Sequence, residues 1–259
     1  MIHWYDRPWA AFIFFTRLPL WRIHQPPKEC YNSVVEWWPL TGWLTGGVMA
    51  AVLYCGSLLL PWPVAVLAAI VARMMLTGAL HEDGLADFFD GFGGGGRDRS
   101  RVLAIMKDSH IGTYGVLALL LYHLLLWSTL QSMTPFFAAL TVLAANPFAR
   151  MVTSQIVMMM PYARNESEAK SKTVYRPIST WAGVGLAVQG LPPICAYLWY
   201  TGVAWEWLVF VPALVMYFLY LFIWRRLRGY TGDCCGAMCL LVELSVYLVA
   251  CSQTINLSQ

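Results

Sequence analysis

Long apolar segments separated by short polar ones dominate the chain. Segments of about 20 residues, the length that crosses the roughly 30 Å hydrocarbon core of a bilayer, recur from residue 36 onward. Residues 8–20 are also apolar but too short to cross, which predicts a short interfacial or re-entrant helix. The pattern predicts an all-α fold, a polytopic membrane helical bundle forming one domain over residues 1–259. The predicted spans are about seven, over 36–60, 62–80, 112–132, 134–160, 179–200, 203–224 and 234–255.

The composition is that of a membrane protein and argues against a soluble globular domain and against a nucleic-acid-binding protein. Hydrophobic residues make up 59% of the chain and charged residues 12%, whereas soluble globular domains have about 25% charged residues. The net charge of +3 is too small to argue for nucleic acid as a partner. Seven cysteines form no C-x-x-C pair, so disulfides and zinc are weakly supported. We therefore expect the lipid bilayer to surround most of the chain.

The basic residues predict the orientation. They gather before the first predicted span and in the connections after the second, fourth and sixth spans, while the other connections carry no Lys or Arg. Because short cytoplasmic loops are enriched in Lys and Arg, this distribution places the N-terminus inside and the C-terminus outside. We expect a multi-pass protein of the cell inner membrane.

An acidic stretch after the second predicted span carries the candidate chemistry. At about 100° per residue, Asp87 lies about 40° and Asp90 about 20° from Asp83, so three carboxylates share one helix face, while Glu82 and His81 point elsewhere. Oxygen ligands suit Mg²⁺, which is usually completed by substrate phosphates. An acidic, solvated helix end is the simpler interpretation, but the shared face favours a metal site open to the cytoplasm. If the helix ended at the following glycines, its negative dipole end would support the cation.

Other charged residues are candidates for binding or for structural roles. The glycine tract 91–96, followed by arginines, could fold over a phosphorylated ligand or serve as a flexible linker. Asp233 ahead of the last span could be a helix N-cap or a further ligand. Arg150 and Glu243 lie inside spans, where an unpaired charge is costly, so we expect them to be partners. Arg73 is also embedded, and we expect it to be paired or to reach the interface.

Several motifs resemble those of one family. The stretch 81–91, HEDGLADFFDG, resembles the H-x-D-G-L-A-D-x-x-D-G signature of the cobalamin synthase, or adenosylcobinamide-GDP ribazoletransferase, family. Residues 105–115, IMKDSHIGTYG, look like the family's I-M-[KR]-D-S-x-x-G-x-x-G segment, and residues 17–19 match its R-L-P. The glycine tract, Arg73 and the paired cysteines after Asp233 depart from the pattern. Shorter similarities are WPLTG at 38–42, AR at 149–150, YAR at 162–164, TGD at 231–233 and GA at 236–237.

The resemblance implies a reaction and its participants. Such enzymes transfer the adenosylcobinamide-phosphate moiety of adenosylcobinamide-GDP to α-ribazole or α-ribazole 5′-phosphate, releasing GMP, with Mg²⁺ required. A homo-oligomer is an open alternative to a monomer. The candidate catalytic residues are Asp83, Asp87, Asp90 and Asp108, of which the first three would also bind the metal, and the candidate substrate-binding residues are Arg101, Lys107, Arg150, Arg164 and Asp233.

Two other functions compete with this one. A CDP-alcohol phosphotransferase also uses spaced aspartates on membrane helices, but its D-G-x-x-A-R pattern is not met from Asp83, because Asp87 and Phe88 stand where Ala and Arg are expected. A cation transporter would line a path at the bilayer midplane with acidic residues. The acidic stretch here lies at one mouth of the predicted bundle instead.

Overall fold

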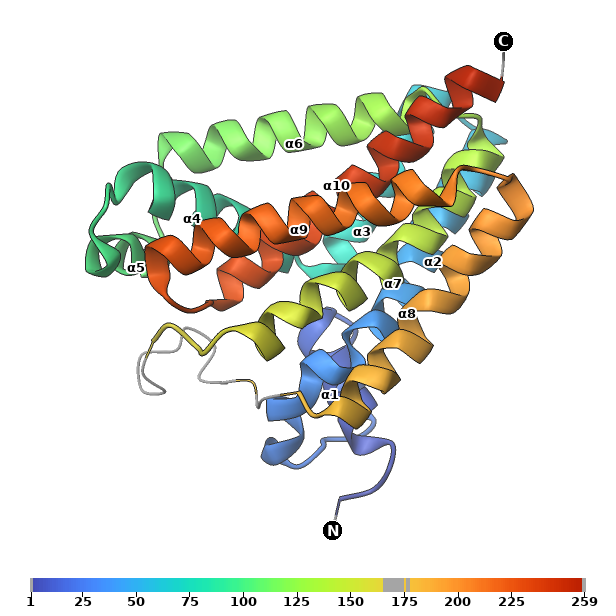
Figure 1. Ribbon diagram of the computed structural model, residues 1–259. Helices are drawn as coiled ribbons and strands as arrows, with labels where there is room; N and C mark the ends of the chain where they lie inside the picture. Colours follow the sequence, from blue (N-terminus) through green and yellow to red (C-terminus); the bar gives the residue numbers. More distant parts are fainter. Residues whose placement is uncertain (1, 165–174, 176–177, 258–259) are drawn as a thin grey trace.

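Helices form the framework of the chain in a computed structural model, which describes residues 2–164, 175 and 178–257. No strand occurs within these ranges, and the all-α class is confirmed (Figure 1). The α-helices are α1 (Asp6–Phe15), α2 (Trp38–Ser57), α3 (Trp62–Thr77), α4 (Leu80–Gly94), α5 (Arg99–Lys107), α6 (Thr113–Gln131), α7 (Pro135–Met159), α8 (Thr180–Thr201), α9 (Trp205–Leu227) and α10 (Gly232–Leu257), with the 3₁₀ helices η1 (Leu20–Arg22) and η2 (Lys28–Trp37).

The membrane-length helices agree with the predicted spans. Six helical segments in the described ranges are long and apolar enough to cross a membrane, and a bent pair, α3 with α4, brings the number up to 7. The predicted short N-terminal helix is present as α1, which has only 10 residues. The chain is therefore a multi-pass membrane bundle.

The second predicted span differs from the expectation in an informative way. Its apolar part, α3, ends at Thr77, and the acidic stretch forms a separate helix, α4, bent by 90° from α3. Gly78 and Ala79 make the bend with left-handed backbone, at φ 64° and 56°. Arg17 holds the bend: its N–H donates to the Leu76 carbonyl at 2.7 Å, and a Cβ at Gly78 would lie 2.0 Å from its Nε. The R-L-P segment thus packs against the bend.

This bend corrects the predicted dipole. The acidic stretch was expected at the C-terminal, negative end of a helix, but Glu82 and Asp83 lie in the first turn of α4. α4 also continues through the glycines after Asp90 as far as Gly94. The positive end of α4 therefore lies beside Asp83, where it favours the carboxylate and other anions rather than a cation.

Two helices form the centre of the bundle. In α10, 83% of the membrane-length window is buried, and in α7 67%, against 22% in α9. α2 approaches α7 closely through glycine, since a Cβ at Gly42 would lie 2.8 Å from the Pro147 backbone and one at Gly46 2.8 Å from Asn146. α6, α8 and α9 lie at the periphery (Figure 1). They expose many apolar side chains, which suits helices that face lipid.

Candidate active site

A cavity lies where the first turns of α4 and α10 meet. The two helices touch through glycines: a Cβ at Gly84 would lie 3.2 Å from the Cα of Asp233, and one at Gly236 3.4 Å from the Cα of His81. This contact brings Asp83 and Asp233 to the wall of one cavity of about 230 Å³. Because both helices begin here, both positive helix ends favour anions at this place.

Aromatic side chains form the rest of the wall. The rings of Phe15, Trp38 and His81 lie within 10° of parallel, with centroids 5.2 to 6.2 Å apart. Between α7 and α8, burial raises the pKa of Tyr162 and of Tyr175. The cavity thus combines an aromatic wall with a carboxylate edge. His81, which was expected to point away from Asp83, lines the same cavity.

Arg164 brings a positive charge to the carboxylates. The segment after α7 is tied to the start of α10, because Ala163 N–H donates to the Tyr230 carbonyl at 2.8 Å and Tyr230 N–H to the Pro161 carbonyl at 3.0 Å. From there the Arg164 side chain reaches Asp233, with 3.9 Å between Nη2 and Oδ2. Arg164 also lines a second cavity, of about 400 Å³, beside α5. The predicted substrate-binding pair Arg164 and Asp233 is therefore brought together at one site.

Asp90 has backbone partners of its own. Its two carboxylate oxygens accept N–H bonds from Gly112 at 2.7 Å and Gly115 at 2.8 Å, at the start of α6. A Cβ at either glycine would lie within 2.5 Å of an Asp90 oxygen. Two glycines of the 105–115 segment are thus explained by the space that Asp90 occupies. Asp90 ties α4 to the N-terminus of α6.

The carboxylates on the cavity are the kind of ligand that a hard cation prefers. Neither Asp87 nor Asp90 lines the cavity, and within the described ranges no three His, Cys, Asp or Glu side chains gather closely enough to hold a metal ion. Asp83 and Asp233 offer oxygen donors only. Mg²⁺ is usually bound through one or two carboxylates, with water and substrate phosphates completing its shell. The pair therefore fits a magnesium site that substrate would complete.

Comparisons with known proteins agree with this arrangement. A model of the Cobalamin-5-phosphate synthase family matches residues 7–251. The chain belongs to this family. Three relatives are each called adenosylcobinamide-GDP ribazoletransferase: those of Shewanella frigidimarina, 37% identical over 93% of this chain and 92% of the relative, Ralstonia nicotianae, 36% over 95% of both, and Shewanella baltica, 35% over 93% and 91%. No solved structure is significantly similar to the chain.

Family membership settles the class of activity. The chain is an enzyme of the adenosylcobinamide-GDP ribazoletransferase type, acting in the assembly of the cobalamin nucleotide loop. The lipid phosphotransferase and cation transporter readings have no support in these similarities. The family resemblance drawn from the acidic signature is thereby confirmed.

Other candidate residues of this family member lie apart from the first cavity. Asp108 follows α5 in an exposed position, where its Oδ1 lies 2.6 Å from Nδ1 of His110. This hydrogen bond lowers the pKa of Asp108 and raises that of His110. Arg101 is exposed and lines neither cavity, whereas Lys107 lines the second one.

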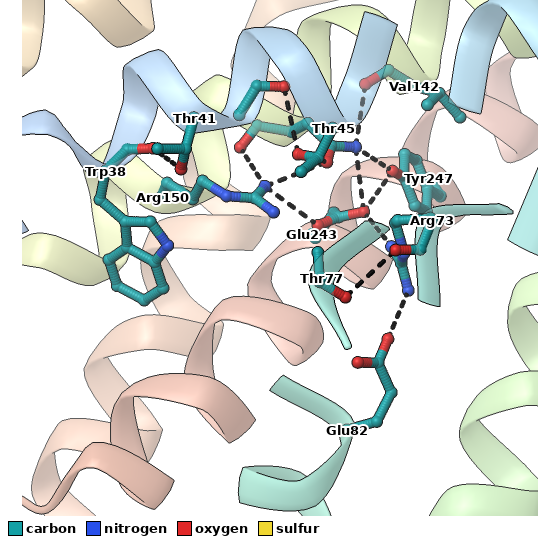
Figure 2. A network of polar contacts seen from close by, with 12 residues as sticks. Trp38, Thr41, Thr45, Arg73, Thr77, Glu82, Val142, Arg150, Glu243 and Tyr247 are labelled. Carbon is teal, nitrogen blue, oxygen red and sulfur yellow. Dashed lines mark hydrogen bonds and ion pairs between the residues drawn. The ribbon is translucent and has the colours of Figure 1, made fainter. Parts of the chain in front are cut away.

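Arg150 belongs to a buried charge network in the bundle (Figure 2). Its Nη1 lies 3.7 Å from Oε2 of Glu243, so the expected partnership is confirmed. Arg73 donates to Glu243 at 2.7 Å and to Glu82 at 3.2 Å, and is therefore paired inside the protein. Asn146 also donates to Glu243, at 3.2 Å. Arg150 lines neither cavity, and its predicted part in substrate binding stays a prediction.

Sequence reasoning missed the aromatic wall and Arg99. Phe14 and Phe15 belong to the segment predicted as an interfacial or re-entrant helix, and Trp38 belongs to the first predicted span. Trp38 is the first residue of the WPLTG motif, and the similarity of this motif to the family could have marked Trp38 as a candidate site residue. Arg99 donates to the carbonyls of Leu227 at 2.7 Å and Ala163 at 2.6 Å, a role that no local pattern could indicate.

Proposed function

We propose that the enzyme transfers the adenosylcobinamide-phosphate moiety of adenosylcobinamide-GDP to α-ribazole or its 5′-phosphate, releasing GMP, with Mg²⁺ bound at Asp83 and Asp233. The observation that carries the proposal is the meeting of these two carboxylates with Arg164 at one cavity, between two helix N-termini. Bound Mg²⁺ would neutralise charge on the pyrophosphate. Asp87 and Asp90 do not line this cavity, and their place in the predicted metal site stays a prediction.

The proposed reaction assigns a task to each side chain. A ribose hydroxyl oxygen of α-ribazole attacks the corrinoid-side phosphorus, the new P–O bond forms, and the P–O bond to GMP breaks. The hydroxyl proton passes to the carboxylate oxygen of Asp83 that would not bind Mg²⁺, and Asp83 is the exposed member of the pair. Arg164 lies beside Asp233 and stabilises the negative charge on the phosphates. The aromatic wall holds the planar base of α-ribazole by stacking.

We also propose that the cavity faces the cytoplasm in a cell inner membrane, with the N-terminus inside. The support is the charge distribution along the chain together with the fold. α5, the end of α9 and the start of α10 lie at the same end of the bundle (Figure 1), and basic residues cluster there. Substrates and GMP would then exchange with the cytoplasm.

One assay tests the proposed reaction. The purified protein in lipid nanodiscs is incubated with adenosylcobinamide-GDP and α-ribazole, and both GMP and the completed corrinoid are quantified. We expect equal amounts of the two products with Mg²⁺ and none after chelation, with activity restored when Mg²⁺ is returned. Turnover at full rate in chelator would remove the metal from the proposal, and no GMP under any divalent cation would overturn the reaction.

A further inference from the structure

The second cavity adjoins the first through a shared residue. Arg164 lines both, so a ligand that reaches from one cavity to the other passes its guanidinium. The second cavity is basic, because Arg99, Lys107 and Arg164 line it, together with Ser100, Leu103, Ala104 and Ala163. The first cavity instead carries the carboxylates and the aromatic wall. The two cavities therefore differ in charge and suit different parts of a substrate.

The wall of the second cavity is held in place by bonds between distant segments. Arg99 of α5 donates from Nε to the carbonyl of Leu227, at the end of α9, and from Nη2 to that of Ala163. Arg164 donates back to the Leu103 carbonyl of α5 at 3.1 Å. These bonds orient two guanidinium groups before any ligand arrives.

Arg164, which lines both cavities, has one N–H donor without a hydrogen-bond partner among the described residues. Nε of Arg164 is buried and has no hydrogen-bond partner within the described part of the chain. Leaving a buried charged donor without a partner is energetically unfavourable. A phosphate oxygen is a natural acceptor for it, because guanidinium groups and phosphates match in charge and geometry.

The volumes of the two cavities also suit different parts of the substrate. Pockets for drug-sized ligands measure about 300–1,000 Å³. The first cavity, at about 230 Å³, is too small to hold a ribazole nucleoside and a guanosine nucleotide together. The second, at about 400 Å³, has room for a nucleoside monophosphate.

We infer that the second cavity is the subsite for the departing nucleoside monophosphate, with its phosphate against Arg164 and Lys107. This inference rests on the proposed function, in which the P–O bond to GMP breaks and the electron pair stays on the GMP phosphate. Arg164 stands between the breaking bond and the subsite, where it stabilises that charge. Lys107 lines this cavity and makes the second charged contact, whereas Arg97 and Arg101 do not line it.

Direct binding of GMP tests the subsite. Isothermal titration calorimetry is run on the full-length protein in nanodiscs, without the corrinoid. Lys107→Gln should raise the Kd for GMP about 10- to 100-fold, as expected for a lost charge-assisted hydrogen bond. Ala104→Trp places a large side chain in the cavity at an exposed helix position and should raise the Kd for GMP to a similar degree. Arg97→Gln, also exposed, is the matched control and should leave the Kd within a few-fold.

The same variants separate the subsite from the reaction. With adenosylcobinamide-GDP and α-ribazole as substrates, Lys107→Gln and Ala104→Trp should raise the KM for adenosylcobinamide-GDP and leave the KM for α-ribazole unchanged. If both variants bind GMP as tightly as the wild type while turnover persists, the subsite is wrong and the proposed function stands. If the wild type binds GMP but never releases it from adenosylcobinamide-GDP, the proposed function is wrong instead.

Discussion

Replacing Glu243 by Gln should destabilise the bundle more than any other conservative change of an acidic residue. Oε1 of Glu243 accepts bonds from Arg73 at 2.7 Å, Asn146 at 3.2 Å and Tyr247, and Oε2 lies 3.7 Å from Arg150. Glu243 is 0% exposed, and Arg73 and Arg150 are each 2% exposed. The substitution therefore leaves two buried guanidinium groups with one fewer carboxylate.

The expected cost is about 3–5 kcal/mol, the range for removing one partner of a buried ion pair. That is a large part of the roughly 5–15 kcal/mol that stabilises a typical protein. The measurement is reversible unfolding in bicelles titrated with sodium dodecyl sulfate. Glu206→Gln, in the exposed first turn of α9, is the matched control and should change the unfolding free energy by no more than about 0.5 kcal/mol.

A double substitution checks the cause. Arg73→Gln combined with Glu243→Gln removes one charge of each sign, so its cost should fall short of the summed single costs by about 0.5–3 kcal/mol. Additive costs would show that the two side chains do not interact. A cost below about 1 kcal/mol for Glu243→Gln alone would refute the network as a source of stability.

Three further outcomes are expected. Asp108→Asn should lower the pKa of His110 toward its ordinary value of 6.5, as read from ring proton shifts in an NMR titration. The stabilisation from this pair is present below pH 6.5 and disappears as the pH rises through the raised pKa of His110. An unchanged His110 titration in the variant would contradict the hydrogen bond. Gly115→Ala should cost about 1–3 kcal/mol, because its Cβ would lie 2.4 Å from Asp90, whereas Gly47→Ala, with open space, should not; equal costs would contradict the packing. A cysteine reporter at the C-terminus should react only from outside intact cells, and labelling from the cytoplasm would contradict the seven-span topology.

Local features of the sequence predict most of this fold. A membrane-length apolar segment forms a helix wherever it sits, because a bilayer leaves its backbone no other partners. The bend between α3 and α4 could not be predicted in this way. It depends on Arg17, about sixty residues earlier, packing on Gly78, and on left-handed backbone at Ala79, which few non-glycine residues adopt.

The candidate site, like the fold, could be predicted from the sequence only in part. Helical spacing put Asp83 and Asp90 on one face, but in the structure Asp83 lines the cavity whereas the N-terminus of α6 occupies both oxygens of Asp90. Asp233 and Arg164 were chosen separately, and their meeting depends on the pairing of Tyr162 with Tyr230 between distant segments. Tertiary contacts, which spacing does not encode, decide which acidic residues face the cavity.

The most direct measurement is GMP release by Asp83→Asn and Asp233→Asn, compared with Asp98→Asn. Each change removes one carboxylate charge at nearly constant size. Asp98 caps α5 by accepting from Ser100 N–H at 2.9 Å, a bond that Asn can also make. We expect turnover to fall at least about 100-fold in the first two variants and to stay near wild type in the third, with all three inserted and folded alike. Wild-type turnover by Asp83→Asn and Asp233→Asn at limiting Mg²⁺ would contradict the assignment of the catalytic centre to this cavity.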